Sequence, residues 1–183
     1  MKDKKAIRQE IKIAKQTLTT DMRIEAEKEI LNLLLQNEHI KKCHNIALYY
    51  SLPDELPTHN IINKFITMGY NIFLPVITEK DIVFKKYDSS IKLQNEEKFG
   101  IAEPTSTPLL PLDEPFVVIT PGIAFTTDGI RLGRGGGYYD RFFYHCKQLN
   151  CNIYKIGIAY KCQKRQMLPN ETFDVKMDCV YFA

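Results

Sequence analysis

A run of three consecutive glycines, Gly135 to Gly137, constrains the fold of this chain more than any other feature of its sequence. Glycine inside a helix or strand costs about 0.5–1 kcal/mol relative to alanine, so the run indicates positive φ angles or close backbone approach. The apolar residues 116–120 and the turn at 121–122 precede it and predict a short buried strand. Residues 140–149 follow with a helical pattern. The glycines therefore lie between a strand and a helix, where α/β folds bind ligands.

The segment 131–141 around these glycines is rich in groups that bind phosphate and metal. Arg131, Arg134 and Arg141 carry permanently charged donors with fork geometry, and glycine N–H groups can converge on an anion. Asp140 is the segment's carboxylate and suits a hard cation such as Mg²⁺. The segment is not a Walker A loop, because no Gly-Lys-Ser/Thr follows, and it lacks the third spaced glycine of the dinucleotide fingerprint. It predicts a different phosphate loop, and the alternative is a glycine-rich turn with solvated charges.

Alternating strand and helix patterns predict one layered α/β domain spanning residues 1–183. We expect helices at residues 3–17, from a cap at Thr20 or Asp21 to residue 36, from a cap at Thr58 to residue 68, and at residues 140–149. We expect strands at residues 46–50, 72–74 (stopped by Pro75), 82–84, 116–120 and 153–159. The proline-rich residues 103–115 read as a structured surface loop, and the chain from residue 161 onward as irregular.

The composition is that of a globular protein without a membrane span or secretory signal, so we expect a cytosolic protein. Five scattered cysteines favour neither a disulfide framework nor a zinc site, and the four histidines lack metal-ligand spacing. A net charge of +3 is too small to indicate nucleic-acid binding. Small anionic ligands are compatible with it, and we expect no nucleic-acid or membrane partner and a monomer or weak dimer.

Short motifs spread in order along nearly the whole chain match one known family. They lie at residues 4–8, 49–55, 99–104, 121–125, 129–141 and 156–160, with Gln163, Leu168-Pro169 and Phe173-Asp174. On these motifs the chain is identified as a member of the 5-formyltetrahydrofolate cyclo-ligase family, also called 5,10-methenyltetrahydrofolate synthetases. Phe173 departs from the pattern, because many members have His before the aspartate.

The resemblance implies a layered α/β/α, Rossmann-like sheet of the sugar-phosphate isomerase and CoA-transferase type. It also implies conversion of 5-formyltetrahydrofolate to 5,10-methenyltetrahydrofolate, with ATP as co-substrate, Mg²⁺ as metal, and release of ADP and phosphate. The formyl oxygen would attack the γ-phosphorus of ATP, and N10 would then close on the activated carbon. No protein nucleophile is implied, because positioning and cations do the work.

The same resemblance assigns residues to each ligand. ATP would be bound by Lys4, Lys5, Arg8, Arg131, Leu132, Gly133, Arg134, Gly135, Gly136, Gly137, Tyr138, Tyr139 and Arg141. The reduced folate would be bound by Tyr50, Glu55, Arg134 and Tyr138, and the metal by Asp140 and Asp174, with Asp178 in reserve. A carboxylate at residue 55 can accept hydrogen bonds from the N–H groups of a pterin, and Tyr50 can offer an aromatic wall.

The residues alone leave alternatives open. The basic face at Lys4, Arg8 and Lys12 also fits a solvated amphipathic helix, Glu55 fits a capping role, and Asp174 fits a surface charge. A sugar-phosphate isomerase or transferase would use the glycine loop without ATP. A non-enzymatic nucleotide-binding module would bind ATP without turnover. Phosphate release from ATP that depends on the folate distinguishes the cyclo-ligase from both.

Overall fold

A six-stranded sheet forms the centre of the molecule in a computed structural model that describes residues 3–95, 100 and 102–183. Its strand order is β10-β9-β6-β1-β2-β3, and the neighbours pair in parallel except β3, which runs antiparallel to β2. The strands are β1 (Asn45–Leu48), β2 (Asn71–Ile77), β3 (Ile82–Tyr87), β6 (Phe116–Thr120), β9 (Ile153–Ala159) and β10 (Cys179–Phe182). Phe99 and Ile101, two positions of the motif at 99–104, lie outside the described residues.

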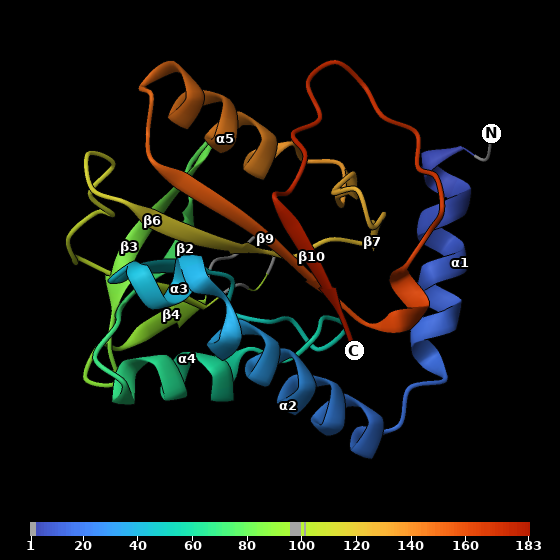
Figure 1. The fold of residues 1–183 in the computed structure, drawn as a ribbon, viewed down its shortest axis with the longest axis horizontal. Helices are drawn as coiled ribbons and strands as arrows, with labels where there is room; N and C mark the ends of the chain where they lie inside the picture. The colour runs from blue at the N-terminus through green and yellow to red at the C-terminus, as the bar shows by residue number, and fades with distance from the viewer. Residues whose placement is uncertain (1–2, 96–99, 101) are drawn as a thin grey trace.

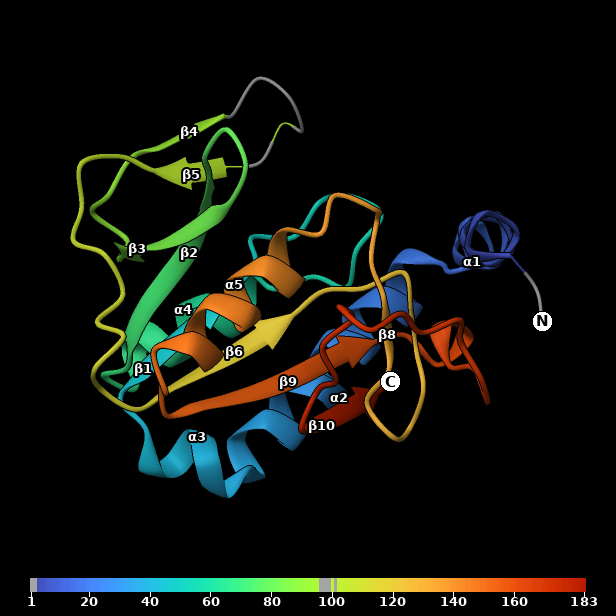
Figure 2. The ribbon, with the colours of Figure 1, turned by 90° about the horizontal axis from the view of Figure 1, so that it is seen from above.

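Helices cover both faces of this sheet, which confirms the layered α/β expectation (Figure 2). The helices α2 (Thr20–Gln36), α3 (Glu38–Lys42) and α4 (His59–Thr67) lie on one face, and α5 (Tyr138–Gln148) lies on the other. Two small antiparallel pairs complete the fold, β4 (Leu93–Asn95) with β5 (Ala102–Pro104) and β7 (Ala124–Phe125) with β8 (Arg131–Leu132). A 3₁₀ turn, η1, spans Lys161–Gln163. None of the described helices combines the length and apolar composition that crossing a membrane requires.

The central strands are buried along their whole length because both faces are covered. All residues of β1 and β6 are buried, which explains their continuous apolar sequence rather than an alternating one. Ile30 and Leu34 of α2 pack against this core from one face, and Phe142 and Cys146 of α5 belong to the same cluster on the other. The main core therefore fixes the sheet edge from which the loops emerge.

The N-terminal helix α1 (Lys4–Gln16) stands apart from these layers (Figure 1). Its buried Ile7 and Ile11 form a second, smaller core with Ile123, Ala124 and Leu132 around the β7–β8 pair. The i, i+4 spacing places both isoleucines on one helix face. This second core attaches the basic N-terminal helix to the segment that leads into the glycine run.

The carboxyl ends of β1 and β6 form the switch point of the sheet. From β1 the chain proceeds to β2 and β3 on one side, whereas β6 leads to β9 and β10 on the other. Ligands of open α/β sheets bind where the strand order reverses in this way. The loop after β1 and the glycine segment after β6 therefore emerge at the place where such a fold binds ligands.

Several expectations about single elements were wrong, each for a local reason. Pro75 does not stop β2, because β2 pairs with β1 only up to Phe73 and its β1-facing side needs no N–H at residue 75. The chain after residue 161 is not irregular to its end, since β10 pairs in parallel with β9. The cap of α2 is Thr19, whose side chain accepts a hydrogen bond from the Met22 N–H. The helix after the glycines begins at Tyr138, two residues earlier than expected.

Candidate active site

A cavity of about 980 Å³ lies at the carboxyl ends of the strands. Its lining includes the loop after β1, the turn after β6, the whole segment 131–141, part of α1, and Glu171, Phe173 and Asp174. The predicted site residues that line it are Lys4, Arg8, Tyr50, Glu55, Arg131, Leu132, Gly133, Arg134, Gly135, Gly136, Gly137, Tyr138, Tyr139, Asp140, Arg141 and Asp174. Segments far apart in sequence thus share one cavity.

The glycine run forms the turn that starts α5. Gly135 and Gly137 have φ angles of 109° and 67°, which side-chain-bearing residues rarely adopt. Gly137 is the N-cap of α5 and offers no capping side chain. The first N–H groups of α5 lie at the positive end of the helix dipole, a position that favours an anion. The backbone therefore has the geometry expected of an anion-binding loop.

Arg131 and Asp140 form an ion pair inside the segment. The Arg131 Nη2 donates to Asp140 Oδ2 at 2.7 Å, and the Arg131 side chain is only 5% exposed. The other oxygen of Asp140 accepts from the Val175 N–H at 3.3 Å. Arg131 therefore holds Asp140 in place, and Asp140 ties the start of α5 to the C-terminal segment.

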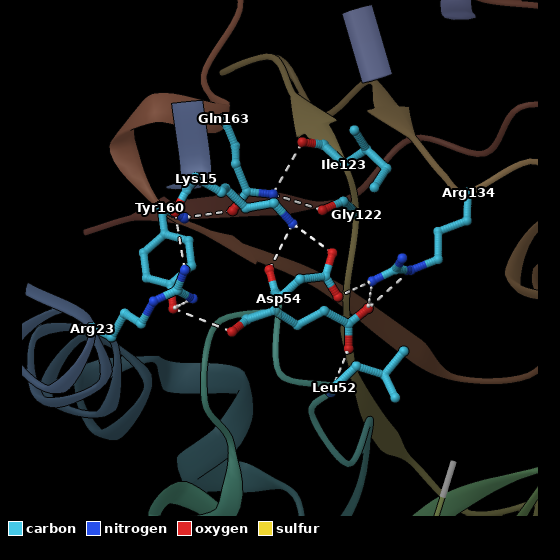
Figure 3. A network of polar contacts seen from close by, with 10 residues as sticks. Lys15, Arg23, Leu52, Asp54, Gly122, Ile123, Arg134, Tyr160 and Gln163 are labelled. Atoms are coloured by element: carbon cyan, nitrogen blue, oxygen red, sulfur yellow. Dashed lines mark hydrogen bonds and ion pairs between the residues drawn. The ribbon is translucent and has the colours of Figure 1, made fainter. Parts of the chain in front are cut away.

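Arg134 and Arg141 point to carboxylates on other loops. Arg134 Nη2 donates to Asp54 Oδ1 at 2.7 Å and to Glu55 Oε1 at 3.0 Å (Figure 3). Arg141 Nε donates to Asp81 Oδ1 at 3.0 Å. Arg134 and Arg141 are each about half exposed, so their guanidinium groups are accessible to a ligand. These carboxylates hold the guanidinium groups at the cavity.

Helix α1 contributes two cations to the cavity. Arg8 Nε donates to the carbonyl oxygen of Gly133 at 3.0 Å, and Lys4 Nζ lies 2.9 Å from Glu171 Oε1 and 3.1 Å from Asp174 Oδ2. Burial would lower the pKa of Lys4, but hydrogen bonds to the two carboxylates outweigh it and raise that pKa. Lys5 is exposed and does not line this cavity, because one residue along a helix rotates a side chain by about 100°.

The loop between β1 and α4 holds Glu55 in a fixed conformation. Ser51 and Thr58 exchange hydrogen bonds between N–H groups and hydroxyls at 3.1 Å in each direction. The Thr58 hydroxyl also donates to the Tyr49 carbonyl at 2.8 Å instead of capping α4. The Glu55 Oε2 accepts from the Leu52 N–H at 3.0 Å. This loop presents the Glu55 carboxylate to the cavity, and the Glu55 side chain is only 13% exposed.

An aromatic pair joins the loop after β1 to the start of α4. Tyr50 and His59 pack edge to face, with ring centroids 4.2 Å apart. Burial lowers the pKa of His59 despite the opposing field of Glu27. Tyr50 therefore lines the cavity beside a histidine whose neutral form is favoured.

The carboxylates predicted for a metal are placed differently from one another. Asp140 and Asp174 both line the cavity. The Asp178 carboxylate instead accepts hydrogen bonds from the backbone N–H of Lys155, at 2.7 Å, and from the Lys155 ammonium group. Asp178 does not line the cavity. Over the described ranges no group of three or more His, Cys, Asp and Glu side chains could hold a metal ion. Mg²⁺ often binds through one or two carboxylates plus phosphates, so Asp140 and Asp174 suit that mode of binding.

Two buried donors at the cavity have no hydrogen-bond partner among the described residues, Arg131 Nε and the Tyr139 hydroxyl. Burial raises the pKa of Tyr139 well above its ordinary value, so the hydroxyl keeps its proton. Buried donors of this kind are normally satisfied. Together with the uncapped α5 and the carboxylates, they fit a polyanion with a bound cation.

The sequence did not indicate every lining residue. Phe173 lines the cavity although its side chain is 80% exposed, and Tyr144, Glu171 and Asp81 line it as well. Glu171 and Asp174 form a turn closed by the bond from the Glu171 N–H to Asp174 Oδ2 at 2.8 Å. Phe173 belongs to the motif Phe173-Asp174, whereas neither periodicity nor a local motif marks Asp81, Tyr144 and Glu171.

A cavity at the switch point, lined by a glycine-rich segment and ordered carboxylates, is typical of α/β enzymes that bind small ligands. The model of the 5-formyltetrahydrofolate cyclo-ligase family matches residues 1–183. The chain belongs to this family, and it is a ligase.

Individual relatives agree with this assignment. The chain is 34% identical to the 5-formyltetrahydrofolate cyclo-ligase of Haemophilus influenzae, covering 93% of this chain and 92% of that protein. The structure of the 5,10-methenyltetrahydrofolate synthetase of Aquifex aeolicus superposes with a TM-score of 0.82 at 25% identity, over 98% of this chain and 89% of that one. The synthetase of Mycoplasma pneumoniae gives a TM-score of 0.74 at 26% identity, over 98% of both chains.

Proposed function

We propose that this enzyme converts 5-formyltetrahydrofolate to 5,10-methenyltetrahydrofolate with ATP and Mg²⁺, releasing ADP and phosphate in the cytoplasm. The observation that carries the proposal is the single cavity lined both by Tyr50 and Glu55 and by the glycine segment. Tyr50 and Glu55 are assigned to the folate, and the glycine segment is assigned to ATP. A reaction in which folate oxygen meets the γ-phosphorus needs the two ligands side by side.

The residues divide between the two ligands by charge. Arg8, Arg134 and Arg141 have the charge and geometry for phosphate oxygens, and the N–H groups at the start of α5 add dipoles. Tyr50 and Glu55 carry no positive charge and suit the ring and N–H groups of a pterin. Arg134 bonds to Glu55, so it stands at the boundary between the two.

The chain's part in the reaction is positioning and charge neutralisation. The formyl oxygen attacks the γ-phosphorus as the bond to ADP breaks. N10 then bonds to the formyl carbon and loses its proton, and the oxygen leaves with the phosphate, which takes up that proton. Guanidinium groups offset negative charge that develops on the transferring phosphoryl oxygens. Mg²⁺ held by Asp140 and Asp174 would supply further neutralisation of phosphate charge. No side chain has to form a covalent intermediate.

The deciding experiment measures phosphate release from ATP with and without 5-formyltetrahydrofolate, together with the absorbance of the methenyl product. We expect phosphate release and methenyl formation each to require both substrates, with one phosphate released for each molecule of methenyl product. Phosphate release that is the same with and without the folate, or ATP binding without any turnover, would contradict the proposal. A sugar-phosphate isomerase or transferase on the same fold predicts no ATP requirement.

A further inference from the structure

Lys15 is a buried lysine outside the residues assigned to either ligand. It lies in the last turn of α1, its side chain is only 6% exposed, and it does not line the cavity described above. Its ammonium donates to the carbonyl oxygen of Asp54 at 2.6 Å and to Asp54 Oδ2 at 3.0 Å (Figure 3). Burying an ammonium group is costly unless it is paired and hydrogen-bonded. Its position on Asp54 is therefore strongly determined.

Asp54 lies between two cations. One carboxylate oxygen accepts from Lys15, and the other accepts from Arg134 at 2.7 Å. Burial would raise the pKa of Asp54, but the bonds from Lys15 and Arg134 outweigh it and lower that pKa. Arg134 also bonds to Glu55, so two cations and two carboxylates form one connected, charge-balanced group.

The hold on Asp54 extends to the backbone of Glu55. The Asp54 carbonyl and the Glu55 N–H belong to the same planar peptide group. Lys15 binds that carbonyl, while the Glu55 N–H donates to the Leu52 carbonyl at 2.9 Å. On its other side the Glu55 carbonyl accepts from the Tyr160 hydroxyl at 3.2 Å. Both peptide groups of Glu55 are thereby fixed, one of them by a buried charge.

We propose that Lys15 is a positioning residue for folate recognition, acting through the Asp54–Glu55 peptide group. Lys15 holds this peptide so that the Glu55 carboxylate keeps its direction toward the cavity. Arg134 cannot serve the same purpose alone, because it is 48% exposed and lies on the glycine segment assigned to ATP. The proposal rests on the assignment of Glu55 to the folate.

The test is a double-mutant cycle on folate binding, measured by calorimetry without ATP. Lys15→Met and Glu55→Gln are each expected to raise the Kd for 5-formyltetrahydrofolate on the order of tenfold, which is the effect of losing one charged hydrogen bond. If Lys15 acts through Glu55, the double variant binds no more weakly than Glu55→Gln alone. A merely structural role would instead give losses that add. Lys12→Met, on the same helix and exposed, is the matched control and should bind like wild type.

Each other outcome has one meaning. Wild-type affinity in Lys15→Met, or additive losses, overturns the proposal and leaves the proposed function standing. Failure of the wild-type protein to bind the folate overturns both. If Lys15→Met does not fold, Asp54→Asn replaces it in the cycle, because it removes the carboxylate charge that keeps the Lys15 ammonium beside the Asp54 carbonyl. Asp54 is half exposed, and the amide keeps the side-chain shape. Wild-type affinity in Asp54→Asn then overturns the proposal.

Discussion

Asp140 has two roles at the scale of the single residue, because its carboxylate both faces the cavity and pairs with a buried guanidinium. We expect Asp140→Asn to lose Mg²⁺-dependent turnover, since an amide is a poor ligand for a hard cation. We also expect a loss of about 2 kcal/mol in the free energy of unfolding, because Arg131 loses its charged partner. Activity against Mg²⁺ concentration and thermal unfolding measure the two effects. Near-normal activity at limiting Mg²⁺ would remove Asp140 from the metal site, and Asp128→Asn on the exposed surface serves as control.

His59 gives the stability a pH dependence of known sign. Its pKa in the folded protein is lower than the ordinary value of about 6.5, so the unfolded chain binds more protons around that pH. We therefore expect stability to fall as pH falls below about 6.5, and His59→Gln to reduce that slope. Urea unfolding at pH 7.5 and 5.5 measures it, with His145→Gln at an exposed position as control. An unchanged slope in His59→Gln would contradict the assignment.

At the scale of the element, the face of α1 decides which of its cations can meet a ligand. Lys4 and Arg8 are one turn apart and line the cavity, whereas Lys5 does not. We expect Arg8→Ala to raise the KM for ATP about tenfold or more, with Lys4→Ala in the same direction and Lys5→Ala near wild type. Steady-state kinetics with each substrate varied in turn tests this. An equal effect of all three substitutions would indicate nonspecific attraction by the helix charge.

The elements with a strong apolar pattern could be predicted from sequence, and those made by long-range contact could not. Residues 116–120 carry the continuous apolar sequence of a buried parallel strand and form β6 as expected. Residues 153–159, which are mostly apolar and are buried from Ile156 onward, form β9 as expected. β10 is only partly buried and depends on its pairing with β9, a partner that no local pattern shows. The expected stop at Pro75 failed because proline is tolerated where one side of a strand is unpaired.

The candidate site divides in the same way. The glycine run and its arginines form one segment, so the sequence could indicate an anion loop. The pairing of Arg134 with Glu55 joins segments 79 residues apart, and the hold of Lys15 on Asp54 spans 39 residues. Ion pairs between distant loops leave no periodic signal in a single sequence.

At the scale of the whole molecule, Arg134 links the two halves of the cavity. If a nucleotide phosphate draws Arg134 away from Glu55, the carboxylate becomes free to accept hydrogen bonds from the folate. We expect a non-hydrolysable ATP analogue to tighten folate binding severalfold, and the folate to tighten the analogue by the same factor. In Arg134→Met this coupling should disappear. Calorimetric titrations of each ligand with and without the other measure it, and independent binding in the wild type would refute the link.

The separate small core under α1 leads us to expect local opening of this helix while the main sheet stays folded. Ile7 and Ile11 pack on the β7–β8 pair and not on the main sheet, whereas Lys15 near the other end of the helix binds Asp54. We therefore expect α1 to open as one cooperative unit at a lower free energy than the main sheet. Its backbone amides should exchange with deuterium faster than those of β6, and a bound nucleotide that contacts Arg8 should slow them selectively. If α1 opens in this way, a nucleotide that contacts Arg8 would hold the helix in place as it binds, so ligand binding and the closing of α1 would be coupled.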